Sequence, residues 1–125
     1  MSENDIAKAV VHTSYLIHTQ LGPGLFESVY EEVLAYELFQ QGFNIQRQHP
    51  IPLIWKERKL DQGFRADLII NHKVILEIKS VEVIAKVHQK QLLTYLRLAN
   101  CKLGLLINFN SPLIKDGIQR IVNNL

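Results

Sequence analysis

The chain of 125 residues contains a single cysteine, Cys101, so it cannot form an internal disulfide. Cys101 stands just before an apolar stretch, which favours a buried, inert thiol over a nucleophile. The sequence has no Cys-x-x-Cys or His-x-x-x-His pair, no phosphate-binding Walker loop and no Gly-x-Ser-x-Gly motif. These absences argue against structural zinc, nucleotide hydrolysis through a P-loop and serine-hydrolase chemistry.

The sequence also lacks long hydrophobic runs and low-complexity segments. The apolar run at residues 103–107 is far too short to span a bilayer, and residues 1–12 lack the basic and apolar regions of a secretory signal. We therefore expect a soluble, cytoplasmic protein with no membrane partner. Hydrophobic residues make up 47% of the chain, which suits one domain over residues 1–125.

Net charge is small, but it is unevenly distributed. The formal net charge is +2. Residues 1–37 carry six acids against one lysine, a net charge of −5, and residues 38–125 carry thirteen bases against six acids, a net charge of +7. This split fits a basic surface for a polyanion, and it fits ordinary solvated helix and loop charges equally well.

Hydrophobic periodicity predicts two helices at the start of the chain, at residues 4–19 and 26–41, separated by a Gly-Pro-Gly turn. The period then changes to that of strands, and two prolines demote the first extended segment to an edge or bulged strand. The later elements are predicted as that strand at 43–55, a turn at 56–59, hairpin strands at 65–70 and 74–79, a helix at 87–98, a buried central strand at 103–109 and a short helix at 116–122. This α-α-β-β-β-α-β-α order predicts an α/β fold, a mixed sheet flanked by helices.

The predicted hairpin brings like charges together. A three-residue loop at 71–73 places the apolar positions of both strands on one face. In that register Asp67 lies opposite Glu77, and Lys79 projects from the same face as Glu77. Opposed carboxylates are destabilising unless a cation lies between them, so this face suits a divalent metal ion.

Two acids of the second predicted helix fall within its apolar arc, Glu27 and Glu37. Glu27 is the favoured candidate, because it lies in the first turn beside free N–H groups, whereas Glu37 can lean toward solvent. The alternative for Glu27 is an ordinary first-turn acid stabilised by the helix dipole. The helical wheel alone leaves both interpretations open.

A polar seam runs along the helix predicted at 87–98, formed by His88, Gln91 and Tyr95. A glutamine amide and a phenol can position a carboxylate, a water or a phosphate oxygen. They can equally form a hydrogen-bonded pair at the edge of a core. His88 is not a convincing metal ligand.

Three motifs carry a family resemblance. Asp67, separated by nine residues from Glu77-Ile78-Lys79, resembles the D-x(n)-E-x-K core of the PD-(D/E)XK nuclease superfamily. Gln91 and Tyr95 resemble the Q-x-x-x-Y element of some of its branches. Residues 24–30, Gly-Leu-Phe-Glu-Ser-Val-Tyr, resemble the name-giving motif of the small GxxExxY protein family.

The resemblance to the GxxExxY family continues along most of the chain from Leu21 onward. One departure from the superfamily pattern is Ala66, which replaces the proline of the proline-aspartate dipeptide and leaves the Asp67 carboxylate intact. The resemblance implies a restriction-endonuclease-like fold with a metal-dependent site. The residues implied to form that site are Glu27, Asp67, Glu77, Lys79, Gln91 and Tyr95.

Within the implied site, Asp67, Glu77 and the Ile78 carbonyl would hold Mg²⁺ or Mn²⁺, and Glu27 would complete the ligand set or position a second ion. The implied activity is a divalent-metal-dependent nuclease acting on DNA in preference to RNA. The alternative is a catalytically silent nucleic-acid-binding or protein-assembly module on the same fold. The chain offers little surface for specificity, so we expect a homodimer or a partner protein.

Overall fold

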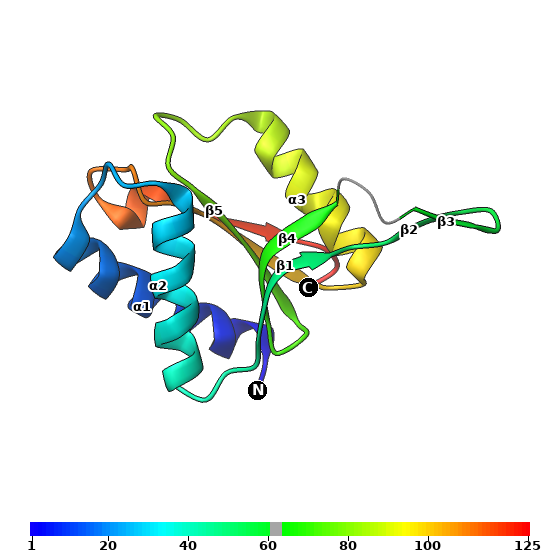
Figure 1. The fold of residues 1–125 in the computed structure, drawn as a ribbon, viewed down its shortest axis with the longest axis horizontal. Helices are drawn as coiled ribbons and strands as arrows, with labels where there is room; N and C mark the ends of the chain where they lie inside the picture. The colour runs from blue at the N-terminus through cyan, green and yellow to red at the C-terminus, as the bar shows by residue number, and fades with distance from the viewer. Residues whose placement is uncertain (61–63) are drawn as a thin grey trace.

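The computed structural model describes residues 1–60 and 64–125. Figure 1 shows a central sheet with helices packed around it and a hairpin that projects from one side. The predicted mixed sheet flanked by helices is therefore confirmed. The elements in chain order are α1 (Glu3–Leu21), α2 (Glu27–Gln40), β1 (Ile45–Pro50), β2 (Leu53–Trp55), β3 (Arg58–Leu60), β4 (Arg65–Ile70), β5 (Val74–Lys79), α3 (Lys86–Ala99), β6 (Leu103–Asn108), the 3₁₀ helix η1 (Ile114–Gly117) and β7 (Ile118–Val122).

The main sheet has five strands in the order β1-β4-β5-β6-β7. Strands β5 and β6 are parallel, and the other neighbouring pairs are antiparallel. Strand β1 lies at an edge, as the prolines predicted. Strand β6 lies between β5 and β7 with all of its residues buried, which confirms the predicted central strand.

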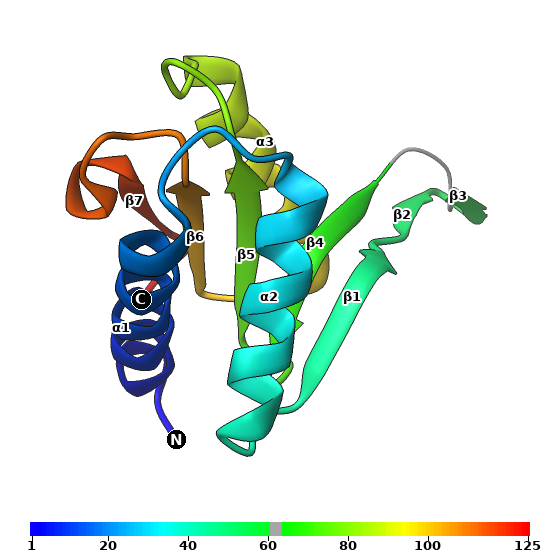
Figure 2. The same ribbon diagram turned by 60° about the vertical axis from the view of Figure 1, so that its left-hand side comes forward.

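The helices cover both faces of this sheet, with α1 and α2 in front of it and α3 behind it in Figure 2. Strand alternation explains the two cores. Leu68 and Leu76 are fully buried in the core that α1 and α2 complete, and Ile69 and Ile75 lie in the core beneath α3. Burying each such side chain stabilises the fold by about 1.5–3 kcal/mol.

The helix predicted at residues 116–122 is wrong. Helix η1 ends at Gly117, and Ile118–Val122 forms β7, which pairs antiparallel with β6. A helix of that length is marginal on its own, whereas the open edge of β6 offers hydrogen-bond partners to every second residue of an extended segment.

The single strand predicted at 43–55 and the turn predicted at 56–59 are also incorrect in part. Strand β1 ends at Pro50, and a separate hairpin follows, in which β2 pairs with β3 around a turn at Lys56 and Glu57. Lys56 has a φ of 55°, the left-handed value that short hairpin turns require. No helix within residues 1–60 and 64–125 is long and apolar enough to cross a membrane.

Candidate active site

The hairpin of β4 and β5 has the register that its apolar alternation requires. Leu68 pairs with Leu76 and Ile70 with Val74 across a three-residue turn. The turn places Asn71 in the left-handed region, with a φ of 52°, and its side chain accepts a hydrogen bond from the Asn44 N–H at 2.8 Å. The predicted register is therefore confirmed up to Leu68.

Beyond Leu68, backbone N–H groups of the two strands donate hydrogen bonds to the carboxylates of Asp67 and Glu77 in place of backbone carbonyls. The Asp67 N–H donates to Glu77 Oε2 at 2.8 Å, and the Ile78 N–H donates to Asp67 Oδ2 at 2.7 Å. In an extended strand the N–H and C=O of one residue point to the same side, so the Ile78 carbonyl also faces β4. The structure thus brings two carboxylates and one carbonyl oxygen together between β4 and β5.

Asp67 and Glu77, which we call the acid pair, have too little positive charge nearby to offset the cost of ionising both. Glu77 is 5% exposed, and burial together with the neighbouring Asp67 charge raises the pKa of its carboxyl to about 8. Burial also raises the pKa of Asp67, and the Glu31 charge adds to that effect. A bound cation would remove this cost, because it favours the ionised form of both groups.

Lys79 lies close enough for its charge to lower the pKa of both Asp67 and Glu77, although burial outweighs it. Its side chain is half-buried and makes no ion pair with either carboxylate. Within the described part of the chain, the one ion pair joins Arg47 and Glu31 at 3.1 Å. The Lys79 ammonium is therefore near the two acids without being neutralised by them.

The acid of α2 that approaches this pair is Glu31, which the helical wheel missed. Glu31 is 6% exposed, whereas Glu27 is exposed, so the prediction that Glu27 lies in the buried arc is wrong. The Gln48 amide donates to Glu31 Oε1 at 2.6 Å and to Asp67 Oδ1 at 3.2 Å. Gln48 therefore links Glu31 to the acid pair.

The backbone of Gln48 explains how its side chain reaches both acids. Its φ is 46°, in the left-handed region that a residue other than glycine seldom adopts, and it lies between residues of β1 that pair regularly with β4. Glu31 carries a weak sequence signal, since it precedes the buried Leu34 by three residues and the buried Leu38 by seven. Gln48 carries none, because a left-handed residue inside a strand cannot be read from side-chain type.

Glu27 makes a different contact, at the end of β5. Its carboxylate accepts a hydrogen bond from the Ser80 N–H at 2.9 Å, and the Ser80 hydroxyl donates to the Leu25 carbonyl at 2.7 Å. These bonds fasten the start of α2 to the residue after Lys79. Glu27 thus lies beside the site, joined to it through Ser80.

Tyr30 holds the loop that precedes Glu27. Its ring is fully buried and stacks on Phe109 at a centroid distance of 4.4 Å. Its hydroxyl donates to the Gly22 carbonyl at 2.6 Å and accepts from the Leu25 N–H at 3.2 Å. In the motif at residues 24–30 the tyrosine is therefore a structural anchor that fixes where α2 begins.

Tyr30→Phe is expected to lower the free energy of unfolding by about 1–2 kcal/mol, because the ring still packs and the two hydroxyl hydrogen bonds are lost. Urea unfolding measures the change. Tyr36→Phe is the matched control, since Tyr36 is on the same helix and 60% exposed. Equal stabilities of the two variants would show that the Tyr30 hydroxyl does not hold the loop.

The three residues of the polar seam on α3 have different surroundings. Tyr95 is buried in the core that also contains Ala66, the residue before Asp67, and burial and then the charges of Glu77 and Asp67 raise the pKa of its phenol. Gln91 is exposed on the same helix. His88 Nδ1 accepts a hydrogen bond from the Ala85 N–H at 3.1 Å, so His88 closes the first turn of α3.

A family model describing the PD-(D/E)XK nuclease superfamily matches residues 4–121. The chain belongs to this superfamily. The match spans every residue of the site, and the five-stranded mixed sheet flanked by helices is consistent with the restriction-endonuclease-like fold. Searches of curated proteins and of solved structures gave no match. The narrower resemblance to the GxxExxY family rests on its motif and stays a prediction.

Nucleases of the PD-(D/E)XK superfamily typically use divalent metal ions, and the donor set here fits such an ion. No three His, Cys, Asp or Glu side chains among the described residues form a metal-binding group. Asp67 and Glu77 supply two carboxylates, and the Ile78 carbonyl faces the same space. Mg²⁺ is commonly held by one or two carboxylates and keeps several waters, so this small set is sufficient.

Proposed function

We propose that this protein is a divalent-metal-dependent nuclease that hydrolyses phosphodiester bonds in DNA in preference to RNA. The observation that supports it best is the acid pair of Asp67 and Glu77. Backbone N–H groups orient both carboxylates, burial makes their charge costly, and Lys79 lies nearby without an ion pair to either carboxylate. A cation between the acids and a phosphate against the ammonium would neutralise all three groups.

The residues of the chain have separate roles in the proposed reaction. Asp67, Glu77 and the Ile78 carbonyl would hold Mg²⁺ or Mn²⁺. When bound, the ion would supply Lewis-acid polarisation of the scissile phosphate and a lowered pKa for the attacking water. Lys79 would donate a hydrogen bond to a non-bridging phosphate oxygen, where negative charge grows in the transition state, or orient the attacking hydroxide.

Hydrolysis forms a bond from the water oxygen to phosphorus and breaks the bond from phosphorus to one ester oxygen. The attacking water gives up a proton to solvent, and the leaving ester oxygen takes up a proton from solvent. We propose that Glu27 completes the ligand set or positions a second ion. Tyr95 is proposed to orient Glu77, and the exposed Gln91 to contact the phosphate. The enzyme is proposed to act as a homodimer or with a partner protein, because its small surface limits specificity.

The rival function is a catalytically silent nucleic-acid-binding or protein-assembly module. In that account Lys79 would form an ion cluster with Asp67 and Glu77, which is not the arrangement found among the described residues. Cleavage decides between the two. Wild-type protein is assayed on linear, nicked, single-stranded and branched DNA and on RNA, with Mg²⁺, Mn²⁺ or EDTA. If the wild-type protein cleaves no substrate faster than Glu77→Ala does, the silent module is favoured.

Metal binding has its own expected result in thermal unfolding. Mn²⁺ at millimolar concentration should raise the melting temperature of the wild type and leave that of Asp67→Asn unchanged, because the variant lacks one ligand. In EDTA, Asp67→Asn should be as stable as the wild type or more so, since the Asn carbonyl can still accept the Ile78 N–H and the like-charge repulsion is gone.

Glu32→Gln is the matched control for this metal experiment, since Glu32 is an exposed acid on α2. It should respond to Mn²⁺ like the wild type. A clear loss of stability of Asp67→Asn in EDTA would instead mark Asp67 as a structural hydrogen-bond partner. Equal Mn²⁺ responses of wild type and Asp67→Asn would contradict the proposed ligand set.

A further inference from the structure

The hairpin of β2 and β3, residues 53–60, stands away from the body of the protein, and we call it the arm. Figures 1 and 2 show it extending from the side of the sheet where β1 ends and β4 begins. Its strands pair through Leu53 with Leu60, Ile54 with Lys59 and Trp55 with Arg58. Ile54 and Trp55 are 67% and 63% exposed. An isolated two-stranded ribbon is at best marginally stable in water, which suggests that the arm has a binding partner.

The base of the arm is fixed to the candidate active site. The Ile51 N–H donates to the Phe64 carbonyl at 2.8 Å, and Ile51 is 1% exposed. The Phe64 ring meets the Tyr95 ring edge-on, with centroids 6.4 Å apart. Tyr95 shares a core with Ala66, the residue before Asp67, so this aromatic contact fixes the root of the arm to the sheet next to the acid pair.

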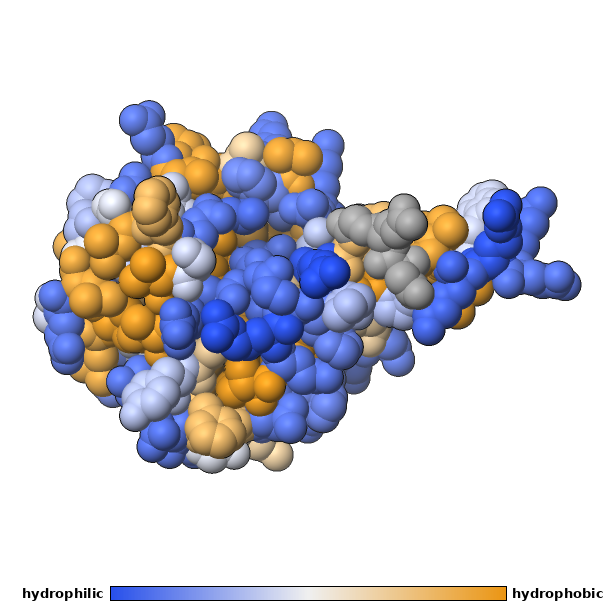
Figure 3. Space-filling model, viewed as in Figure 1, coloured by the Kyte–Doolittle hydropathy of each residue, from blue (hydrophilic) through white to orange (hydrophobic). Residues whose placement is uncertain are grey.

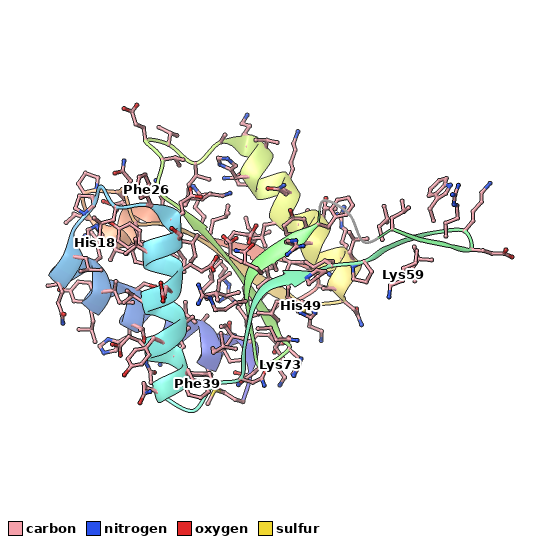
Figure 4. All side chains as sticks on the ribbon, in the orientation of Figure 1. His18, Phe26, Phe39, His49, Lys59 and Lys73 are labelled. Carbon is pink, nitrogen blue, oxygen red and sulfur yellow. The ribbon has the colours of Figure 1, made fainter. Side chains whose placement is uncertain are left out.

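The arm is basic. It carries Lys56, Arg58 and Lys59 against one acid, Glu57. All four side chains are exposed, Lys59 lies on the arm inward of its tip in Figure 4, and the outer end of the arm is hydrophilic in Figure 3. Trp55 faces Arg58 across the ribbon and can hold its guanidinium in place by stacking. These features suit a polyanion.

Further arginines continue the basic surface from the arm toward the acid pair. Arg65 opens β4 two residues before Asp67 and pairs with Pro50, at the end of β1. Arg47 lies on the neighbouring strand with 45% of its side chain exposed, and its guanidinium also pairs with Glu31 at 3.1 Å. A nucleic acid that touched the arm could therefore follow positive charge to the site.

We infer that the arm grips double-stranded DNA beside the phosphate to be cut, with the β2–β3 ribbon in the major groove. The inference rests on the proposed nuclease function and adds the substrate class. The major groove of B-form DNA, about 12 Å wide, admits a two-stranded ribbon, whereas that of A-form RNA is too narrow for side chains to read. Arg58 and Lys59 then contact backbone phosphates, and the acid pair lies next to the same duplex.

Binding is tested without turnover, by fluorescence anisotropy in EDTA with one sequence as duplex DNA, single-stranded DNA and duplex RNA. The arm variant is Arg58→Ala with Lys59→Ala. The control is Lys8→Ala with Lys115→Ala, which removes the same charge from exposed positions on α1 and η1. Thermal unfolding checks that both variants fold, and light scattering gives their masses.

The arm variant is expected to bind duplex DNA at least about tenfold more weakly. The slope of log K against log salt concentration should fall by about 1.8 in magnitude, because two phosphate contacts are lost at about 0.9 each. The control should bind like the wild type, and the wild type should prefer duplex DNA to single strands and duplex RNA. Equal duplex binding by the arm variant and the control overturns the inference.

A lower mass of the arm variant without DNA also overturns the inference, since the arm would then contact a second copy of the chain. Cleavage assays separate this inference from the proposed function. If duplex DNA binds through the arm but is not cleaved in Mn²⁺, the inference about the arm holds and the proposed nuclease function is contradicted. If wild type and arm variant cleave duplex DNA equally well, the proposed nuclease function holds and the inference about the arm is contradicted.

Discussion

Lys79→Ala is expected to reduce phosphodiester cleavage by about 10²–10³-fold, the loss typical of removing one group that stabilises transition-state charge. Its ammonium lies near Asp67 and Glu77 and is not paired with either, so its charge remains available for the phosphate. Mn²⁺ should still stabilise the variant, because Lys79 is not a metal ligand and its positive charge opposes a cation. Loss of turnover with retained metal binding identifies a residue that acts in the transition state.

Single-turnover cleavage and Mn²⁺ titration followed by thermal unfolding are the two measurements. Lys102→Ala is the matched control, because Lys102 is exposed and precedes β6. Since β5 and β6 run parallel, Lys102 lies at the opposite end of the sheet from Lys79. Cleavage by Lys79→Ala at the wild-type rate would remove Lys79 from the mechanism.

Glu77→Gln is expected to remove the part of the pH dependence of stability that Glu77 contributes in the metal-free protein. The pKa of Glu77 is raised from 4.5 to about 8, chiefly by burial. A group whose pKa is raised by folding contributes stability that is complete below its unfolded pKa and is lost as pH rises through its folded pKa. The wild type should therefore lose this contribution between about pH 4.5 and pH 8, and the variant has none to lose.

Urea unfolding in EDTA at pH 5, 7 and 9 measures the difference between wild type and Glu77→Gln. From pH 5 to pH 9 the variant should gain at least about 1.4 kcal/mol relative to the wild type, the equivalent of one pKa unit. The Gln amide oxygen can still accept the Asp67 N–H, so packing is conserved. At pH 8 Mn²⁺ should stabilise the wild type but not Glu77→Gln. Parallel pH profiles of stability for the two proteins would show that folding does not raise the pKa of Glu77.

Local sequence patterns were sufficient to predict the β4–β5 hairpin and most of the other helices and strands. Strict alternation on both strands allows one register, because a shift by one residue would turn every apolar side chain to the other face. That register brought Asp67, Glu77 and Lys79 to one end of the hairpin. The two long helices and the buried strand β6 were also readable, since buried residues recur at helical spacing in α1 and α2 and β6 is a short continuous apolar run.

Local patterns failed where a segment depends on a distant neighbour. Residues 118–122 carry too short a pattern to choose between helix and strand, and the open edge of β6 made them β7. Residues 53–55 of the arm were predicted as the end of a longer strand and residues 56–59 as a turn, because the charged tip resembles a loop and only cross-strand pairing makes the segment a ribbon.

The helix acid at the site was decided in the same way. The helical wheel ranks residues around one helix axis, but burial depends on where α2 lies against the sheet. Tyr30 and the Glu27–Ser80 bond fix the start of α2 at the end of β5, which leaves Glu27 exposed and carries Glu31 to Gln48. The sequence alone thus determined the acid pair and its lysine, whose spacing within one hairpin sets their geometry. Only tertiary structure decided which helix acid joins them, because that contact depends on packing between segments far apart in the chain.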